Sequence, residues 1–133
     1  MRPSIRRCIL LTGLLAMFMT MGFSATPDEP ARMKQFLYVL HLVPRLHAQT
    51  AWTDADNKAV ADHFQRLKLA TQARTVLLAG RTSEPLDQTF GIVIFEASDE
   101  ASARKFMESD PTVAAGVMTA TLHPFAVALL RAP

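Results

Sequence analysis

Four histidines and the acids near them, above all one isolated aspartate, are the candidates for acid–base chemistry in this chain. The histidines are His41, His47, His63 and His123, and the aspartate is Asp110, the last acidic residue before the C-terminus. An imidazole titrates near neutral pH, and a carboxylate beside it fixes its tautomer, so such a pair can accept and return a proton. The chemistry therefore depends on which histidine the fold brings to Asp110.

His63 is the best placed of the four histidines. A helix is predicted around it, because apolar residues recur at spacings of four, three and four. His63 lies at the edge of that stripe, where the wall of a pocket would be. Most histidines in such places are only satisfied polar groups, so its distance from Asp110 decides between a functional and a structural role. The stripe consists of Val60, Phe64, Leu67 and Thr71.

The other three histidines are weaker candidates. His41 ends the first predicted strand and could line a cavity from the sheet. His47 lies in a loop and is expected to face solvent, and His123 directly precedes Pro124, which favours a structural role on an edge strand.

Asp110 has two interpretations, because the next residue is Pro111. The aspartate can cap a following helical turn, since proline suits the first helical position. It can also be a site carboxylate held on a rigid turn. The two roles are compatible, because one oxygen can cap while the other accepts from an imidazole. We expect His63 and Asp110 to face one cleft within direct or one-water hydrogen-bonding reach, walled by the loop that carries His47 and Trp52.

Other chemistries lack support in the sequence. No His-x-x-x-His spacing indicates a metal site, and neither a glycine-rich phosphate loop nor a Gly-x-Ser-x-Gly elbow is present. The single cysteine, Cys8, lies in the N-terminal segment and would be removed with it, which excludes disulfides and a cysteine nucleophile. We therefore expect a site without cofactor or metal.

The length of 133 residues indicates one domain, and the charge does not indicate nucleic acid. The formal net charge is +2, but three of the 14 basic residues are Arg2, Arg6 and Arg7. Without them, 11 bases face 12 acids, and no basic stripe with interleaved aromatic residues remains. No nucleic-acid partner is therefore expected.

Residues 1–24 are predicted to be a secretory signal peptide. The positive start is followed by an uncharged run from Cys8 to Phe23 and by the small residues Gly22 and Ser24. That run is shorter than the roughly 18 residues of a spanning helix. We expect a periplasmic or secreted protein with no membrane segment after signal removal. Residues 25–34 form a proline-containing linker, and residues 35–131 form the domain.

The elements that must position the site alternate between strand and helix patterns. Their order, β-α-β-β-α-β, predicts an α+β fold of the ferredoxin-like, split-βαβ type. Pro124 places the last strand at a sheet edge or at a bulge. The expected strands are 35–43, 75–79, 90–96 and 118–130, and the expected helices begin after Thr53, fading near Arg74, and after Ser98 as its cap.

The first three strands are apolar at both odd and even positions, which indicates that both faces of the sheet are covered. Two helices can cover only one face of a four-stranded sheet, and a bare apolar face of that size would be unusual. The simplest cover is a second copy of the sheet, so we expect a homodimer.

Five segments carry a resemblance to a known family. They are Ala61-Asp-His-Phe-Gln-Arg-Leu, Leu77-Leu-Ala-Gly, Phe95-Glu-Ala-Ser-Asp-Glu-Ala-Ser-Ala-Arg-Lys-Phe, Ser109-Asp-Pro-Thr-Val-Ala-Ala-Gly-Val and His123-Pro-Phe. In this order they resemble the YCII-related family, over about residues 35–130. The resemblance implies a dimeric ferredoxin-like α/β-barrel with His63 and Asp110 as the active-site pair. The family's known enzyme is a dehydrochlorinase acting on a chlorinated hydroxyquinol.

The chain differs from that family in two places. It begins with a predicted signal peptide, and Ala73-Arg74-Thr75 stands where the family often has a glycine between the first helix and the second strand. Two functions remain open. One is a cofactor-independent enzyme that acts on a small molecule, which could be aromatic, with His63 as base and Asp110 as its partner. The other is a non-catalytic periplasmic dimer that binds a small molecule or is structural.

The predicted signal peptide has a direct test. Exported protein should begin near Ala25, because cleavage after Ser24 leaves small residues at both recognition positions. N-terminal sequencing of the protein recovered outside the cytoplasm measures this. A mature protein that still begins with Met1 would show that the segment is not cleaved.

Overall fold

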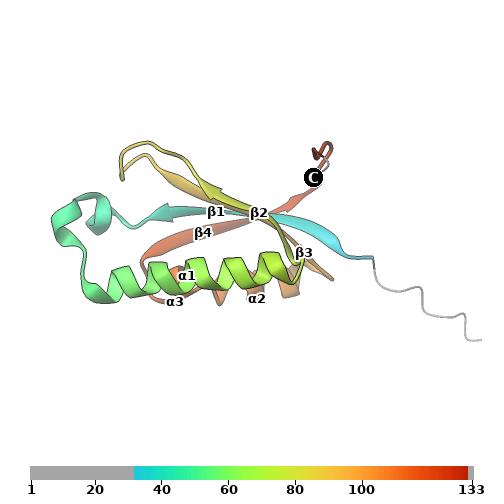
Figure 1. The fold of residues 1–133 in the computed structure, drawn as a ribbon, viewed down its shortest axis with the longest axis horizontal. Coiled ribbons are helices and arrows are strands. Elements are labelled where there is room, and N and C mark those ends of the chain that lie inside the picture. The colour runs from blue at the N-terminus through green and yellow to red at the C-terminus, as the bar shows by residue number, and fades with distance from the viewer. Residues whose placement is uncertain (1–31, 132–133) are drawn as a thin grey trace, which may run out of the picture.

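The structure, a computed structural model, describes residues 32–131. The predicted signal peptide and most of the predicted linker lie outside these residues. Four strands and three α-helices follow one another in the expected β-α-β-β-α-β order, with the short helix α3 added before the last strand (Figure 1). The elements are β1 (Lys34–Leu42), two 3-10 turns η1 (Pro44–His47) and η2 (Gln49–Ala51), α1 (Asp54–Gln72), β2 (Val76–Arg81), β3 (Phe90–Ala97), α2 (Glu100–Glu108), α3 (Pro111–Ala114) and β4 (Met118–Phe125).

The four strands form one antiparallel sheet in the order β2-β3-β1-β4. This order confirms the ferredoxin-like α+β arrangement, in which β1 and β3 lie in the centre. β4 is an edge strand, as Pro124 predicted. The strand ends at Phe125, which pairs with Gln35 near the start of β1, rather than at residue 130.

All three α-helices lie on one face of the sheet (Figure 1). Alternate residues of β1 point to that face and are buried, as the period of two in a strand requires. Aromatic rings fill the centre of this layer: the Phe95 ring stacks on Phe106 with 4.7 Å between centroids and meets Tyr38 edge-on. The core of the domain therefore lies between the sheet and the helices.

α1 begins as the sequence predicted. The Thr53 hydroxyl accepts from the Asp56 amide, and the Asp56 carboxylate accepts from the Thr53 amide, which completes a capping box. Asp56 also forms two hydrogen bonds with Arg45 of η1, and these bonds hold the pKa of its carboxyl well below the usual range. The pair fastens the segment after β1 to the start of α1.

One expectation for the helices was wrong. The cap of α2 is Asp99, not Ser98, because the Asp99 backbone is extended and its carboxylate accepts from the Ser102 amide. In α1, the predicted apolar stripe includes Phe64, which is 68% exposed. Ala59 and Leu67 are the apolar residues that α1 buries.

The opposite face of the sheet is apolar at its centre. Leu37, Val39, Ile92 and Ile94 occupy it and are half-buried, and Leu78 beside them is 44% exposed. Among residues 32–131 no helix covers this face. We refer to these five residues as the open face.

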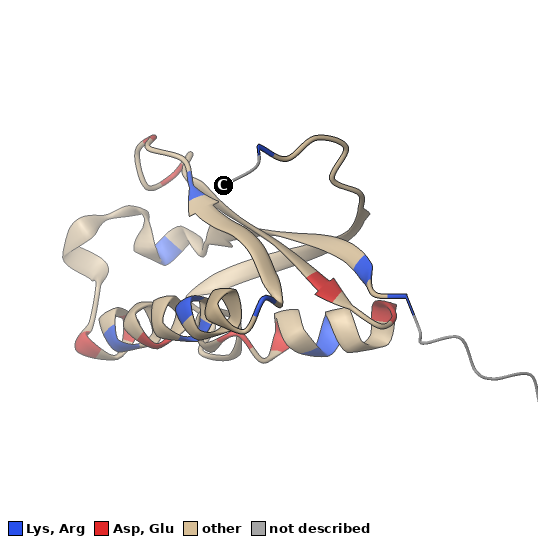
Figure 2. Cartoon of the chain, turned by 45° about the vertical axis from the view of Figure 1, so that its right-hand side comes forward, with Lys and Arg blue, Asp and Glu red and all other residues tan. Residues whose placement is uncertain are grey.

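Basic and acidic residues are interspersed along the helices (Figure 2). Within the described range, no helix is both long and apolar enough to cross a membrane.

Candidate active site

Asp110 precedes a single helical turn, α3, whose start and end are each marked by a residue that favours a helix boundary. Asp110 is the N-cap, with its carboxylate accepting from the Thr112 amide at 3.0 Å, and Pro111 occupies the first helical position. Gly116 ends the turn with a φ of +66°, a conformation that costs glycine little. The turn therefore holds the Asp110 side chain in one place, directed into the protein.

His63 and Asp110 form a direct hydrogen bond. Nδ1 of His63 lies 2.7 Å from Oδ2 and 2.8 Å from Oδ1 of the carboxylate. The pair thus lies within the expected reach, and the carboxylate that accepts from His63 also caps α3. A carboxylate can only accept, so Nδ1 carries the proton. In the neutral form of the ring Nε2 is therefore the nitrogen without a proton, and it makes no hydrogen bond to any described residue.

The Asp110 carboxylate is completely buried and well supplied with donors. The Tyr38 hydroxyl donates to Oδ2 at 2.9 Å, and the Thr112 hydroxyl donates to Oδ1 at 2.7 Å. Burial acts to raise the pKa of Asp110, but the hydrogen bonds from His63 and Thr112 outweigh it and bring the pKa to about 2. Burial also raises the pKa of the Tyr38 phenol, and the Asp110 charge adds to this. Near neutral pH the aspartate is ionised and the tyrosine is a donor.

Arg66 is the cation nearest to this carboxylate. Its Nη1 lies 3.6 Å from Asp110 Oδ2, while Nη2 donates to the Phe106 carbonyl at 2.6 Å and to the Ser109 hydroxyl at 2.9 Å. The guanidinium carbon lies 4.2 Å from the centre of the Phe106 ring, a cation–π distance. Arg66 therefore joins α1 to the end of α2 and brings positive charge to the buried Asp110.

A cleft of about 890 Å³ opens beside His63. It lies between α1 and the edge of the sheet formed by β2 and β3, on the helix side of the sheet. The predicted apolar stripe of α1 lines the cleft, which explains why Phe64 is exposed. The residues of α1 that line it are Asn57, Val60, His63, Phe64, Leu67, Lys68, Thr71 and Gln72.

The remaining histidines lie outside this cleft. The His47 ring lies 3.3 Å from the Leu42 carbonyl oxygen and does not line the wall, which corrects the expectation for that loop. Trp52 does line it, and its indole nitrogen donates to the Leu46 carbonyl. His41 is exposed on the other side of the sheet, so it does not line a cavity from β1. His123 is exposed on β4.

Three residues around Asp110 were missed by the sequence reasoning. Tyr38 was interpreted only as a strand residue, although a buried tyrosine hydroxyl generally needs a partner, and this was the signal available. Thr112 follows the capping aspartate by two residues, which is the position of the amide that a cap binds. Arg66 lies three residues after His63, on the same side of α1, but no pattern indicated which carboxylate it would meet.

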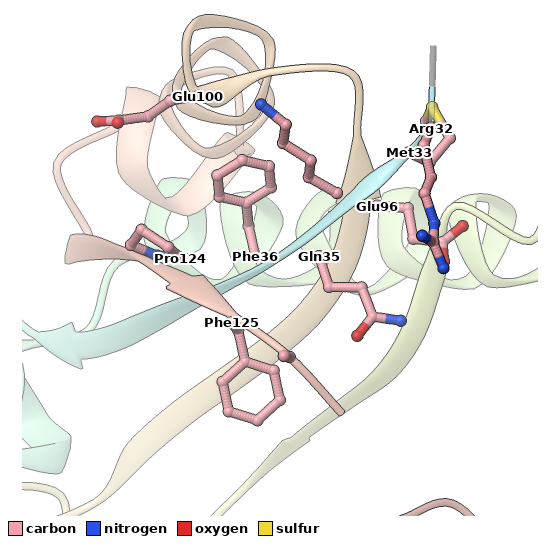
Figure 3. A pocket seen from close by; sticks show the side chains of 10 residues that line it. Arg32, Met33, Gln35, Phe36, Glu96, Glu100, Pro124 and Phe125 are labelled. Carbon is pink, nitrogen blue, oxygen red and sulfur yellow. The ribbon is translucent and has the colours of Figure 1, made fainter. Parts of the chain in front are cut away.

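A second hollow, of about 700 Å³, lies at the other end of the sheet (Figure 3). Phe36 and Phe125 both line it but point to opposite faces of the sheet, so the hollow wraps around the end of the strands. Its lining contains no histidine. Across the described part of the chain, no group of three histidine, cysteine or acidic residues could hold a metal ion. The cleft beside His63 is therefore the candidate site.

The fold and this site together define a small α+β domain in which a histidine–aspartate pair opens into a cleft. A family model, the YCII-related domain, matches residues 36–124, which is well over half of the chain. The chain belongs to the YCII-related domain family. Among curated proteins, none matches the sequence.

Seven chains in solved structures match this chain. One of them is 5-chloro-2-hydroxyhydroquinone dehydrochlorinase from Burkholderia phenoliruptrix AC1100 in complex with 2,5-dihydroxybenzoquinone. The two sequences are 17% identical, the match covers 69% of this chain and 93% of that one, and the TM-score is 0.48. A similarity of this strength does not transfer the chemistry of that enzyme to this chain.

Replacing Asp110 should reduce the acid dependence of stability. The pKa of Asp110 falls from its usual 3.8 to about 2 on folding. Its stabilising effect is therefore complete above about pH 4 and is lost as the pH falls toward 2, with a total of about 2–3 kcal/mol. Asp110→Asn can still cap α3 but carries no charge. Urea unfolding of both proteins between pH 5 and 2 should show a smaller loss of unfolding free energy in the variant.

Asp87→Asn is the matched control, because Asp87 is an exposed loop carboxylate without a hydrogen bond or ion pair among residues 32–131. Asp56, whose pKa is also lowered, is present in all three proteins, so it cancels in the comparison. Parallel curves for the wild type and Asp110→Asn over this pH range would contradict the assignment.

Proposed function

We propose that this protein is a cofactor-independent enzyme that moves a proton on a small molecule, with His63 as the base and Asp110 as its partner. The observation that carries the proposal is the hydrogen bond from His63 Nδ1 to the buried Asp110 carboxylate, which leaves Nε2 free on a ring that lines the cleft. This is the arrangement required of a general base: an unprotonated nitrogen beside a cavity, with its tautomer fixed from behind.

In the proposed step, the lone pair of Nε2 takes a proton from an O–H or C–H group of the bound molecule. The ring then carries a positive charge, which the negative charge of Asp110 stabilises at hydrogen-bonding distance. Tyr38 and Thr112 keep the carboxylate ionised and oriented, so it does not rotate away when His63 becomes charged. Nε2 later returns the proton, and no other reactant is consumed.

The alternative is a dimer that binds a small molecule without turnover. It draws on the same cleft, which is largely apolar and large enough for a ligand. Nothing in a binding role requires a free imidazole nitrogen backed by a buried charge, which is why we favour the enzyme.

The test is proton exchange in D₂O. Hydroxylated aromatic acids, chlorinated hydroxyquinols and enolisable ketones are incubated with the protein, and ¹H NMR detects loss of a C–H signal. Thermal shifts first identify the compounds that bind. For a compound that exchanges, His63→Asn should lower the rate by about 10²–10⁴-fold, the usual contribution of a general base. Asp110→Asn should also lower the exchange rate.

His123→Asn is the matched control, because His123 is exposed on β4 and outside the cleft. Its exchange rate should equal that of the wild type, and circular dichroism should show that all variants are folded. If compounds bind but none exchanges, the binding alternative is the better description. Exchange that persists unchanged in His63→Asn would overturn the role of His63.

The proposal includes export to the periplasm or the medium and assembly into a dimer of the α/β-barrel type. The apolar open face supports the dimer, because a second copy of the sheet would remove Leu78 and its half-buried neighbours from water. Export is supported only by the N-terminal sequence pattern.

Light scattering at micromolar concentration tests the dimer. Residues 26–133 should have twice the mass of one chain, and Ile94→Glu should give the monomer, because it introduces a charge into the centre of the open face. Ala101→Glu adds the same charge at an exposed position of α2 and should remain dimeric. A wild-type monomer would show that the open face is covered in some other way.

A further inference from the structure

The charged residues that line the cleft all share one sign. Apart from His63, they are Lys68 of α1 and Arg81 at the end of β2, and no carboxylate belongs to the lining. Neither cation forms an ion pair with another described residue, whereas Arg45 and Arg66 each lie beside a carboxylate. The cleft therefore carries positive charge that the chain itself does not neutralise.

The sheet register places Arg81 on the helix side of the sheet. Arg81 pairs with Gly91, and Gly91 pairs with Leu40, whose side chain is buried under the helices. Residues that pair directly across strands point to the same face. The Arg81 side chain therefore leaves β2 on the side of the cleft and of α1.

The positions on α1 place Lys68 and His63 on opposite borders of the same wall. At 100° per residue, the two side chains are separated by about 140° around the helix, with Phe64 and Leu67 between them. Asp110 fixes the border that carries His63, which faces into the protein. Lys68 is exposed, so its border faces the mouth of the cleft.

The space between these groups is apolar and open. Gly91 contributes to this, because a Cβ atom there would touch the Leu40 side chain at 3.5 Å and extend over the floor of the cleft. Phe64 is 68% exposed and lines the cleft, and Trp52 also forms part of the lining. These two aromatic side chains beside an apolar floor suit a ligand with an aromatic body.

We propose that the cleft binds a small organic anion with an aromatic body, whose charge is held by Arg81 and Lys68 and whose body lies toward His63. The inference rests on the proposed function for the location of the site, but it requires no turnover. Glu84 and Asp87 lie in the loop between β2 and β3, but neither lines the cleft. A neutral molecule of the same shape would gain the apolar contacts without the charge interaction.

The single tryptophan makes a direct binding assay possible. The protein has one indole N–H signal in a ¹H–¹⁵N spectrum, from Trp52, which lines the cleft. Benzoate and 2-naphthoate are titrated against it, each beside its uncharged amide. Both anions should shift the signal at millimolar concentration and bind several times more tightly than the amides, and added NaCl should weaken the anions only.

Variants identify the groups that hold the charge. Arg81→Met and Lys68→Met should each weaken benzoate binding about two- to fivefold, the range for exposed ion pairs, and leave the amide unchanged. Lys58→Met is the matched control, because Lys58 is on the same helix, outside the cleft, and pairs with Asp62. Equal binding of acid and amide, no shift with either anion, or an equal effect of Lys58→Met would each overturn the proposal.

His63→Asn separates this inference from the proposed function. In this variant benzoate should still bind more tightly than benzamide, and NaCl should still weaken only the anion, because Arg81 and Lys68 hold the charge. Loss of proton exchange together with a retained preference for the anion supports both proposals. If the protein exchanges protons on neutral compounds and shows no preference for anions, only the proposal of an anion site is wrong. If the wild type binds the anions but exchanges no proton, only the proposal of an enzyme is wrong.

Discussion

The arrangement of this domain depends on the hydrogen bonds that the buried carboxylate of Asp110 accepts. It binds Tyr38 of β1, His63 of α1 and Thr112 of α3, so one buried charge connects the sheet to two helices. Burying an ion costs several kcal/mol unless donors surround it. Here the donors are side chains of β1, α1 and α3. The buried charge is therefore stabilised only when these three elements pack together as they do here. Truncating Asp110 would leave buried donors unpaired, which is costlier than losing the contacts alone.

Much of the fold could be predicted because local patterns specify it. The apolar runs of the strands, the cap at Thr53 and the proline at 124 placed most elements within a few residues of their observed bounds. The errors have different causes. Residues 126–130 are apolar enough for a strand, but the pairing with β1 ends at Phe125. The cap of α2 depends on which of two neighbouring residues caps the helix, and that residue is Asp99 rather than Ser98. The spacing of Phe64 correctly indicated a shared helix face, and that face borders the cleft.

The candidate site, like the fold, could be predicted only as far as local sequence patterns and the family resemblance indicate it. His63 and Asp110 could be proposed because both lie at element borders, and the family resemblance matched them. Tyr38 contacts Asp110, which lies 72 residues further along the chain. Arg66 contacts Phe106, which lies 40 residues further along. No single-sequence pattern reports such pairings. The burial of a tyrosine indicates that its hydroxyl needs a hydrogen-bond partner, but it does not indicate which residue that partner is.

The use of Nδ1 for structure limits what the proposed enzyme can do. Because that nitrogen is committed to Asp110, His63 has one nitrogen for chemistry and can hold one transferred proton at a time. Other groups of the cleft lining are poor proton donors: the Trp52 N–H is bound to Leu46, and the Thr89 hydroxyl to Thr82. A reaction that needs a separate acid and base would have to use Lys68, which is exposed at the mouth. The arrangement therefore suits reactions in which one base removes a proton and the same group returns it, such as tautomerisation, or in which an anion leaves unaided after the proton is removed. An anionic product or intermediate would also be favoured by the two cations of the cleft, so the charge at the mouth and the base at the inner wall act in the same direction.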